Sequence, residues 1–176
     1  NIDLAPKFVD ETSGDLRIPV TSPCVDSGTP AGAPSTDFLG IGRPQCSGFD
    51  MGAYEYAPLI RFVDVSHTSG TQDGLSWATA FPAIQQGVDA VASYGGEVWV
   101  REGTYGEAVT MKSGVAVYGG FDGSESSKGQ RDYAAHVTVI DAATLPAPSH
   151  VVTMDGITHS LLDGVTVTHG NANGSS

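Results

Sequence analysis

The chain has 176 residues, of which 40% are hydrophobic, 16% are charged and 23 are glycine. Typical domains carry about 25% charged residues and about 7% glycine, so this composition favours strands joined by turns over a helical bundle. The net charge of −12 excludes a nucleic-acid binder and a protein that binds anionic membranes, because both need a cationic surface. The apolar runs are short, so we expect no transmembrane helix and no signal sequence.

Residues 1–57 are rich in Gly, Pro, Ser and Asp, and their apolar runs are short. No stretch has a helical period, so we expect short strands separated by turns. Cys24 and Cys46 both lie in turn-rich sequence. They are predicted to form a disulfide that closes a loop of about 20 residues and adds about 3 kcal/mol of stability in an oxidising compartment. The alternative is two unpaired thiols that pack as small hydrophobic groups.

A second part, residues 58–176, opens with an alternating strand over residues 60–65. After a polar loop, four apolar residues recur at the spacing of one helical face. They are Phe81, Ile84, Val88 and Val91. Pro82 suits the first turn of a helix, and Gly95-Gly96 suits its end. We therefore expect one helix at about 82–94.

The rest of the chain consists of short β-rich segments, each ended by Gly, Asp or Ser. They span residues 97–100, 108–111, 115–118, 137–140, 151–154, 160–162 and 165–168. Segment 113–120 is echoed at 163–170 as a G-V-x-V-x-x-G unit. The distance along the sequence between these two segments fits two turns of a solenoid with roughly 20–30 residues per coil. We therefore predict an all-β fold, a parallel β-helix with one capping helix. A β-sandwich is the alternative, although it does not predict the repeated unit.

Several motifs occur in order and together carry a family resemblance. They are Phe62–Val65, Asp73–Phe81, Glu97–Val100, Gly103–Tyr105, Lys112–Phe121 and Leu162–Val167. Residues 60–174 resemble the opening of the right-handed parallel β-helix of bacterial surface proteins, the pectate-lyase-like solenoids related to polymorphic outer-membrane proteins and large adhesins. The resemblance implies that the helix at 82–94 plugs the N-terminal end of this β-helix.

Residues 1–57 resemble the other end of the same family, its closing coil, above all in Asp50-Met-Gly-Ala-Tyr-Glu-Tyr56. The closing coil therefore precedes the opening coils in this chain. The family's middle coils, which carry its catalytic residues, are missing, so no catalytic residue and no enzyme activity are predicted. Residues 58–176 are interpreted as the N-terminal cap and the first coils of a β-helix.

This order predicts assembly, because proteins normally cover the unpaired N–H and C=O groups at an open sheet end. Either two tandem β-helix domains meet here, or residues 1–57 of one copy stack on the open 151–170 end of the next. Strand addition that does not close on itself yields a filament. In the predicted interface, Phe8, Val9, Leu16 and Ile18 dock onto Val152, Leu161, Val165 and Val167. Salt or divalent cations should promote this stacking, because the copies repel each other.

The predicted function is thus a non-enzymatic structural or adhesive protein, extracellular or on the cell surface, whose partners are copies of itself or neighbouring repeats. The rival is a truncated carbohydrate-binding or polysaccharide-lyase-like β-helix, in which Trp99, Tyr105 and Tyr118 stack on sugars. Core packing is the competing interpretation of these aromatic residues. No cofactor is expected apart from a structural calcium, for which Asp64 and Asp73 are the candidate ligands.

Overall fold

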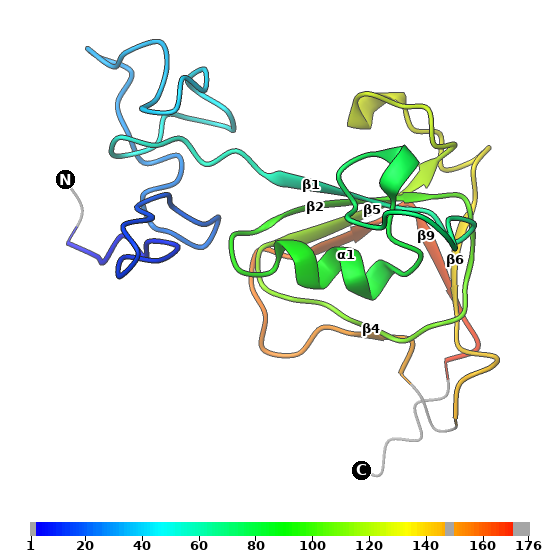
Figure 1. Ribbon diagram of the computed structural model, residues 1–176. Helices are drawn as coiled ribbons and strands as arrows, with labels where there is room; N and C mark the ends of the chain where they lie inside the picture. The colour runs from blue at the N-terminus through cyan, green and yellow to red at the C-terminus, as the bar shows by residue number, and fades with distance from the viewer. Residues whose placement is uncertain (1–2, 147–149, 171–176) are drawn as a thin grey trace.

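The computed structural model describes residues 3–146 and 150–170, and these residues form nine short β-strands, one α-helix and two 3-10 helices (Figure 1). In chain order they are β1 (Leu59–Val63), η1 (Trp77–Thr79), α1 (Ile84–Val91), β2 (Gly96–Arg101), β3 (Gly103–Tyr105), β4 (Val109–Thr110), β5 (Val115–Phe121), η2 (Lys128–Gln130), β6 (Thr138–Asp141), β7 (Val152–Thr153), β8 (Leu161–Asp163) and β9 (Val165–Thr168).

The strands form three parallel sheets, and the chain visits the sheets in turn. The strand orders are β1-β2-β5-β8, β3-β6-β9 and β4-β7. Parallel pairing places residues of successive strands side by side, so apolar side chains form columns. One column runs Val98, Val117, Leu162, and another runs Tyr105, Ile140, Val167. These columns build the main core between the sheets.

The predicted all-β class, a right-handed parallel β-helix, is wrong. The structure is a mixed α/β fold with nine short strands in parallel sheets and one helix. The strands are short because glycines in the left-handed region, such as Gly103, Gly114 and Gly164, repeatedly turn the chain. The helix is shorter than predicted and belongs to the core, since the side chains of Ile84 and Val88 are fully buried in it.

A distant carboxylate caps α1. The residue before the helix, Ala83, has no side chain that can accept a hydrogen bond, and Glu107 takes this role. Its carboxylate accepts hydrogen bonds from the backbone N–H of Ile84 (2.7 Å) and of Gln85 (3.1 Å). Burial raises the pKa of Glu107, although both backbone donors favour the charged form. The helix thus depends on a residue from the loop between β3 and β4.

Gly87 allows α1 to pack closely against the sheet. A Cβ atom at this position would lie 2.7 Å from Val98 Cγ1 and 2.9 Å from Val63 Cγ2, both fully buried residues. We expect Gly87→Val to lower the free energy of unfolding in urea by about 1–3 kcal/mol, because the added atoms must displace the two valines. Ala90→Val, on the exposed side of the same helix, should cost only a few tenths of a kcal/mol. Equal losses in the two variants would contradict close packing as the cause.

The two ends of the sheet stack differ. At one end, the segment before α1 covers the outer edge of β1: Phe62 N–H donates to Gly74 O (3.0 Å), and Phe81 N–H donates to Phe62 O (2.9 Å). At the other end, β8 and β9 each pair with a strand on one side only among the described residues. The stack therefore has a covered end at β1 and an end that we call the open edge, formed by β7, β8 and β9.

Residues 3–57 form loops without a strand or helix, in contrast to the short strands predicted for them. This segment lies beside the sheets and continues into β1 (Figure 1). It packs against the turn after α1 in a second apolar cluster that includes Ile18, Tyr56 and Tyr94. Val20 N–H donates to Tyr94 O (3.2 Å). The division of the chain at residue 57 stays a prediction, although each part has an apolar cluster.

The predicted disulfide is wrong, because Cys24 and Cys46 are both free thiols. Cys24 is buried in the second apolar cluster, whereas Cys46 is exposed and its thiol donates to Tyr56 O (3.8 Å). Burial of the Cys46 Sγ atom, together with nearby carboxylates, raises its pKa. Each thiol thus has its own neighbours, and the loop between them is held by other contacts.

Candidate functional site

At the open edge, the last residue of each core column has a partly exposed side chain. Val109 and Ile140 are at most 1% exposed, yet their register partners in the last strands, Val152 and Val167, are not buried, and Val167 is 47% exposed. The difference arises because no further strand covers β7 and β9 among the described residues. The open edge therefore combines free backbone hydrogen-bonding groups with apolar surface, which is the usual composition of a site for strand addition.

Three of the four residues predicted to receive a neighbour lie at the ends of these columns. They are Val152, Val165 and Val167. Leu161 does not, because it pairs with Ala116 on the other face of the strand and is 45% exposed. The adjacent Leu162 pairs with the buried Val117 and packs against the main core. Alternation along β8 could have identified Leu162, since successive side chains of a strand point to opposite faces.

The residues of the 1–57 segment that are predicted to dock onto another copy mostly pack against their own chain. Ile18 is 3% exposed, and Phe8 and Val9 pack against the same second cluster. Leu16 is the exception, because it is 40% exposed. Of the four, only Leu16 is available to another molecule without a rearrangement of the loops.

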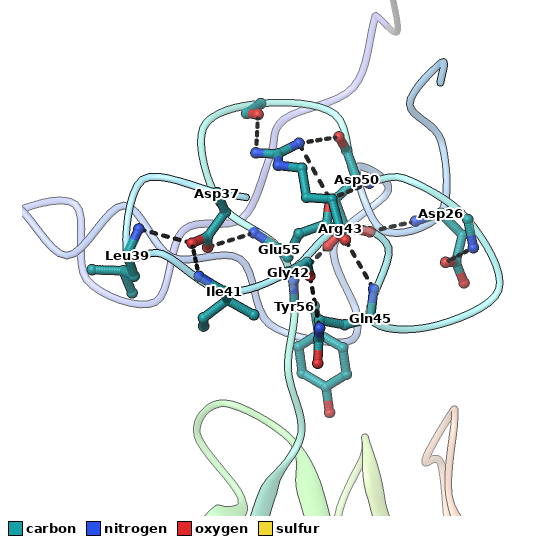
Figure 2. Close-up of polar contacts among 12 residues, drawn as sticks. Asp26, Asp37, Leu39, Ile41, Gly42, Arg43, Gln45, Asp50, Glu55 and Tyr56 are labelled. Atoms are coloured by element: carbon teal, nitrogen blue, oxygen red, sulfur yellow. Dashed lines mark hydrogen bonds and ion pairs between the residues drawn. The ribbon is translucent and has the colours of Figure 1, made fainter. Parts of the chain in front are cut away.

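A buried network of charged residues, which the sequence did not reveal, holds the loops of residues 3–57 together (Figure 2). Asp37, Asp50 and Glu55 are at most 8% exposed, and the Arg43 side chain is 5% exposed. The Arg43 guanidinium lies 3.2 Å from Glu55 Oε1 and donates to Gly52 O (2.8 Å). Its Nε is buried and has no hydrogen-bond partner.

The carboxylates of this network accept mainly backbone N–H groups. Asp37 accepts from Leu39 and Ile41 (2.8 Å each), and Asp50 accepts from Asp26 (2.7 Å) and Tyr56 (2.5 Å). Burial raises the pKa of Asp50, whereas for Asp37 the backbone donors outweigh burial and lower the pKa. These bonds replace the strand pairing that this segment lacks. The network therefore has a structural role, with its carboxylates already saturated by donors.

The candidate calcium ligands are engaged in separate loops. Asp64 accepts from Ser66 N–H (2.8 Å) and pairs with Arg101 (2.8 Å), and Asp73 accepts from Leu75 N–H (3.0 Å). Nowhere in residues 3–146 and 150–170 do three or more His, Cys, Asp or Glu residues gather in a way that could hold a metal ion. The geometry thus gives the calcium prediction no support.

Two of the three candidate sugar-stacking residues are in the interior. Trp99 is 4% exposed and stacks on Phe121 with ring centroids 5.0 Å apart, and Tyr105 is 1% exposed, with its hydroxyl donating to Arg101 O (3.0 Å). Tyr118 reaches the surface, but Lys128 Nζ lies over its ring at 4.4 Å from the centroid. The three rings therefore do not form a platform for a sugar.

Comparison with protein-family models, curated proteins and solved structures finds no match to this chain. Within the described part of the chain, no helix has the length and apolar character needed to span a membrane.

Proposed function

We propose that the protein is a non-enzymatic structural or adhesive protein, extracellular or on the cell surface, that assembles head to tail through its open edge. The observation that carries this proposal is the asymmetry of the sheet stack. One end is covered by the 74–81 segment, and the other presents strands that, among the described residues, are paired on one side only. Such a unit can receive strands at one end, which gives the assembly a direction.

The partner in this proposal is the 1–57 segment of the next copy. Its exposed Leu16 supplies an apolar contact for the half-exposed Val167, and main-chain hydrogen bonds to β8 and β9 supply affinity. The net charge of −12 opposes the contact, so assembly should strengthen with salt as repulsion between copies is screened. The carbohydrate-binding rival receives no comparable support, since Trp99 and Tyr105 are buried.

Val167→Lys tests the proposal. We expect the wild-type chain to form long assemblies in sedimentation velocity and electron microscopy, and the variant to stay small, because a lysine on an edge strand opposes strand addition. Val167 is half exposed, so the variant should melt within a few degrees of the wild type.

The matched control is Leu75→Lys, a substitution at a residue that is 61% exposed in the segment covering the other end. This control should assemble like the wild type. Assembly of Val167→Lys at the wild-type level, or a wild-type chain that stays monomeric at every concentration and salt, would overturn the proposal.

A further inference from the structure

An exposed apolar turn projects from the 3–57 segment. Phe38 is 75% exposed and Leu39 is 56% exposed. Hydrogen bonds hold the backbone of this turn, because the Asp37 carboxylate accepts from the backbone N–H groups of Leu39 and Ile41 (2.8 Å each). Gly40 takes the left-handed conformation that closes the turn (φ 82°). The backbone of the turn is therefore held in one arrangement, which lowers the entropy that a contact would cost. We call Phe38 and Leu39 the knob.

An apolar cleft of about 330 Å³ opens beside the knob. Its main lining residues are Leu4, Phe8, Leu16, Ile18, Met51 and Tyr54. The knob lies at its rim: Phe38 N–H donates to Ala53 O (2.9 Å), and the Phe38 ring meets the Tyr54 ring edge to face at 5.8 Å. Clefts of this size hold small organic ligands, so the volume suffices for the knob of another molecule.

We propose that the knob and the cleft form a symmetric interface between two copies of this chain, in which each knob enters the cleft of the other copy. A two-fold interface requires one patch that is complementary to itself, and a knob beside a cleft of the same character meets this requirement. The knob cannot fill its own cleft, since it points into solvent with Phe38 75% exposed.

Area and charge support a second copy as the occupant. Together with Leu4 (66% exposed) and Leu16 (40% exposed), the knob presents on the order of 400 Å² of surface, so a pair would bury up to about 900 Å² in these residues, which is the size of a weak, transient contact. The cleft is lined by uncharged residues, whereas the chain as a whole carries −12. The cleft lining itself therefore adds no repulsion between carboxylates when two acidic copies meet there.

The interface does not depend on the open edge, but it competes with it. Leu16 lines the cleft, so a copy in the symmetric dimer cannot offer this residue to the β8–β9 edge of another copy. The symmetric contact also closes on itself and stops at two copies, unlike head-to-tail strand addition. The two contacts can therefore be separated by experiment.

Sedimentation equilibrium of the full chain with Val167→Lys, in which head-to-tail addition is blocked, tests the symmetric interface alone. We expect a monomer–dimer equilibrium whose dissociation constant rises roughly tenfold or more with Phe38→Ser, because a central aromatic anchor is lost. Leu16→Glu, which places a charge in the cleft, should weaken the dimer as strongly. Tyr133→Ser, at an aromatic residue that is 62% exposed elsewhere, should leave it unchanged.

Each outcome is decisive for the symmetric interface and leaves the proposed function to its own test. A dimer that Phe38→Ser does not weaken, or one that Leu16→Glu leaves intact, overturns the proposal, because knob and cleft would not belong to one contact. A chain that stays monomeric at about 100 μM also overturns it, because the dissociation constant of the contact would then lie well above that concentration. Unchanged hydrogen exchange at the backbone amides of Gln45, Asp50 and Tyr56 in both variants shows that the loops of residues 3–57 remain folded.

Discussion

Replacing Glu55 with alanine is expected to unfold the loops of residues 3–57 while the sheets stay folded. Glu55 is 2% exposed, and its carboxylate accepts from the backbone N–H of Asp50 (2.9 Å) and of Gln45 (3.3 Å) and lies 3.2 Å from Arg43. Its removal leaves a buried guanidinium beside two unpaired amides. Breaking a buried ion pair from one side costs about 3–5 kcal/mol, which is a large share of the stability of a small unit.

Hydrogen exchange can locate this effect. In Glu55→Ala, the amides of Gln45, Asp50 and Tyr56 should lose protection, whereas amides of β2 and β5 should keep theirs. Glu11→Ala, at an exposed glutamate of the same segment, should change stability by less than about 0.5 kcal/mol. If the two variants behave alike, the buried network does not hold this segment together.

Periodicity predicted α1 and most strands after residue 58, but it failed for the loops of residues 3–57 and for the arrangement of the sheets. The apolar stripe of α1 and the alternating residues of β2 and β5 mark their faces directly, because burial imposes a period of 3.6 or 2 on the sequence. The echo between 113–120 and 163–170 suggested that these segments stack as equivalent coils. In the structure, β5 pairs with β8, and β9 pairs with β6 in another sheet. Gly164, in the left-handed region, turns the chain between β8 and β9, and no residue pattern shows into which sheet it turns.

The buried network could not be predicted from the sequence, for a different reason. Asp37, Asp50 and Glu55 accept chiefly from backbone amides, which every residue except proline supplies, so their spacing carries no recognisable signature. The Asp50–Tyr56 stretch stood out as a motif, and it contains two of these carboxylates. What the motif could not show is that Arg43 lies among them, since that contact depends on the course of the intervening loop. Surface exposure, on which the knob and the cleft rest, is likewise a property of the folded chain.

Replacing Phe121 with alanine should destabilise the sheets themselves. Phe121 ends β5, is fully buried, and stacks on Trp99 (5.0 Å between ring centroids) while it also meets Trp77 (5.6 Å). Trp77 in turn donates from Nε1 to Glu125 O (3.0 Å), which ties the loop after β5 to this aromatic cluster. Truncation to alanine leaves a cavity at the centre of the cluster and should cost about 3–5 kcal/mol.

The two tryptophans of the chain, Trp77 and Trp99, both contact Phe121, so their fluorescence during urea unfolding reports this cluster directly. Phe121→Leu keeps most of the volume and should cost less than about 1.5 kcal/mol, although it loses the ring stacking. The contrast between these variants separates cavity formation from aromatic contact. If leucine proved as costly as alanine, the stability of the cluster would come from ring stacking. If neither substitution cost more than about 1 kcal/mol, the cluster would contribute little to the stability of the β1-β2-β5-β8 sheet.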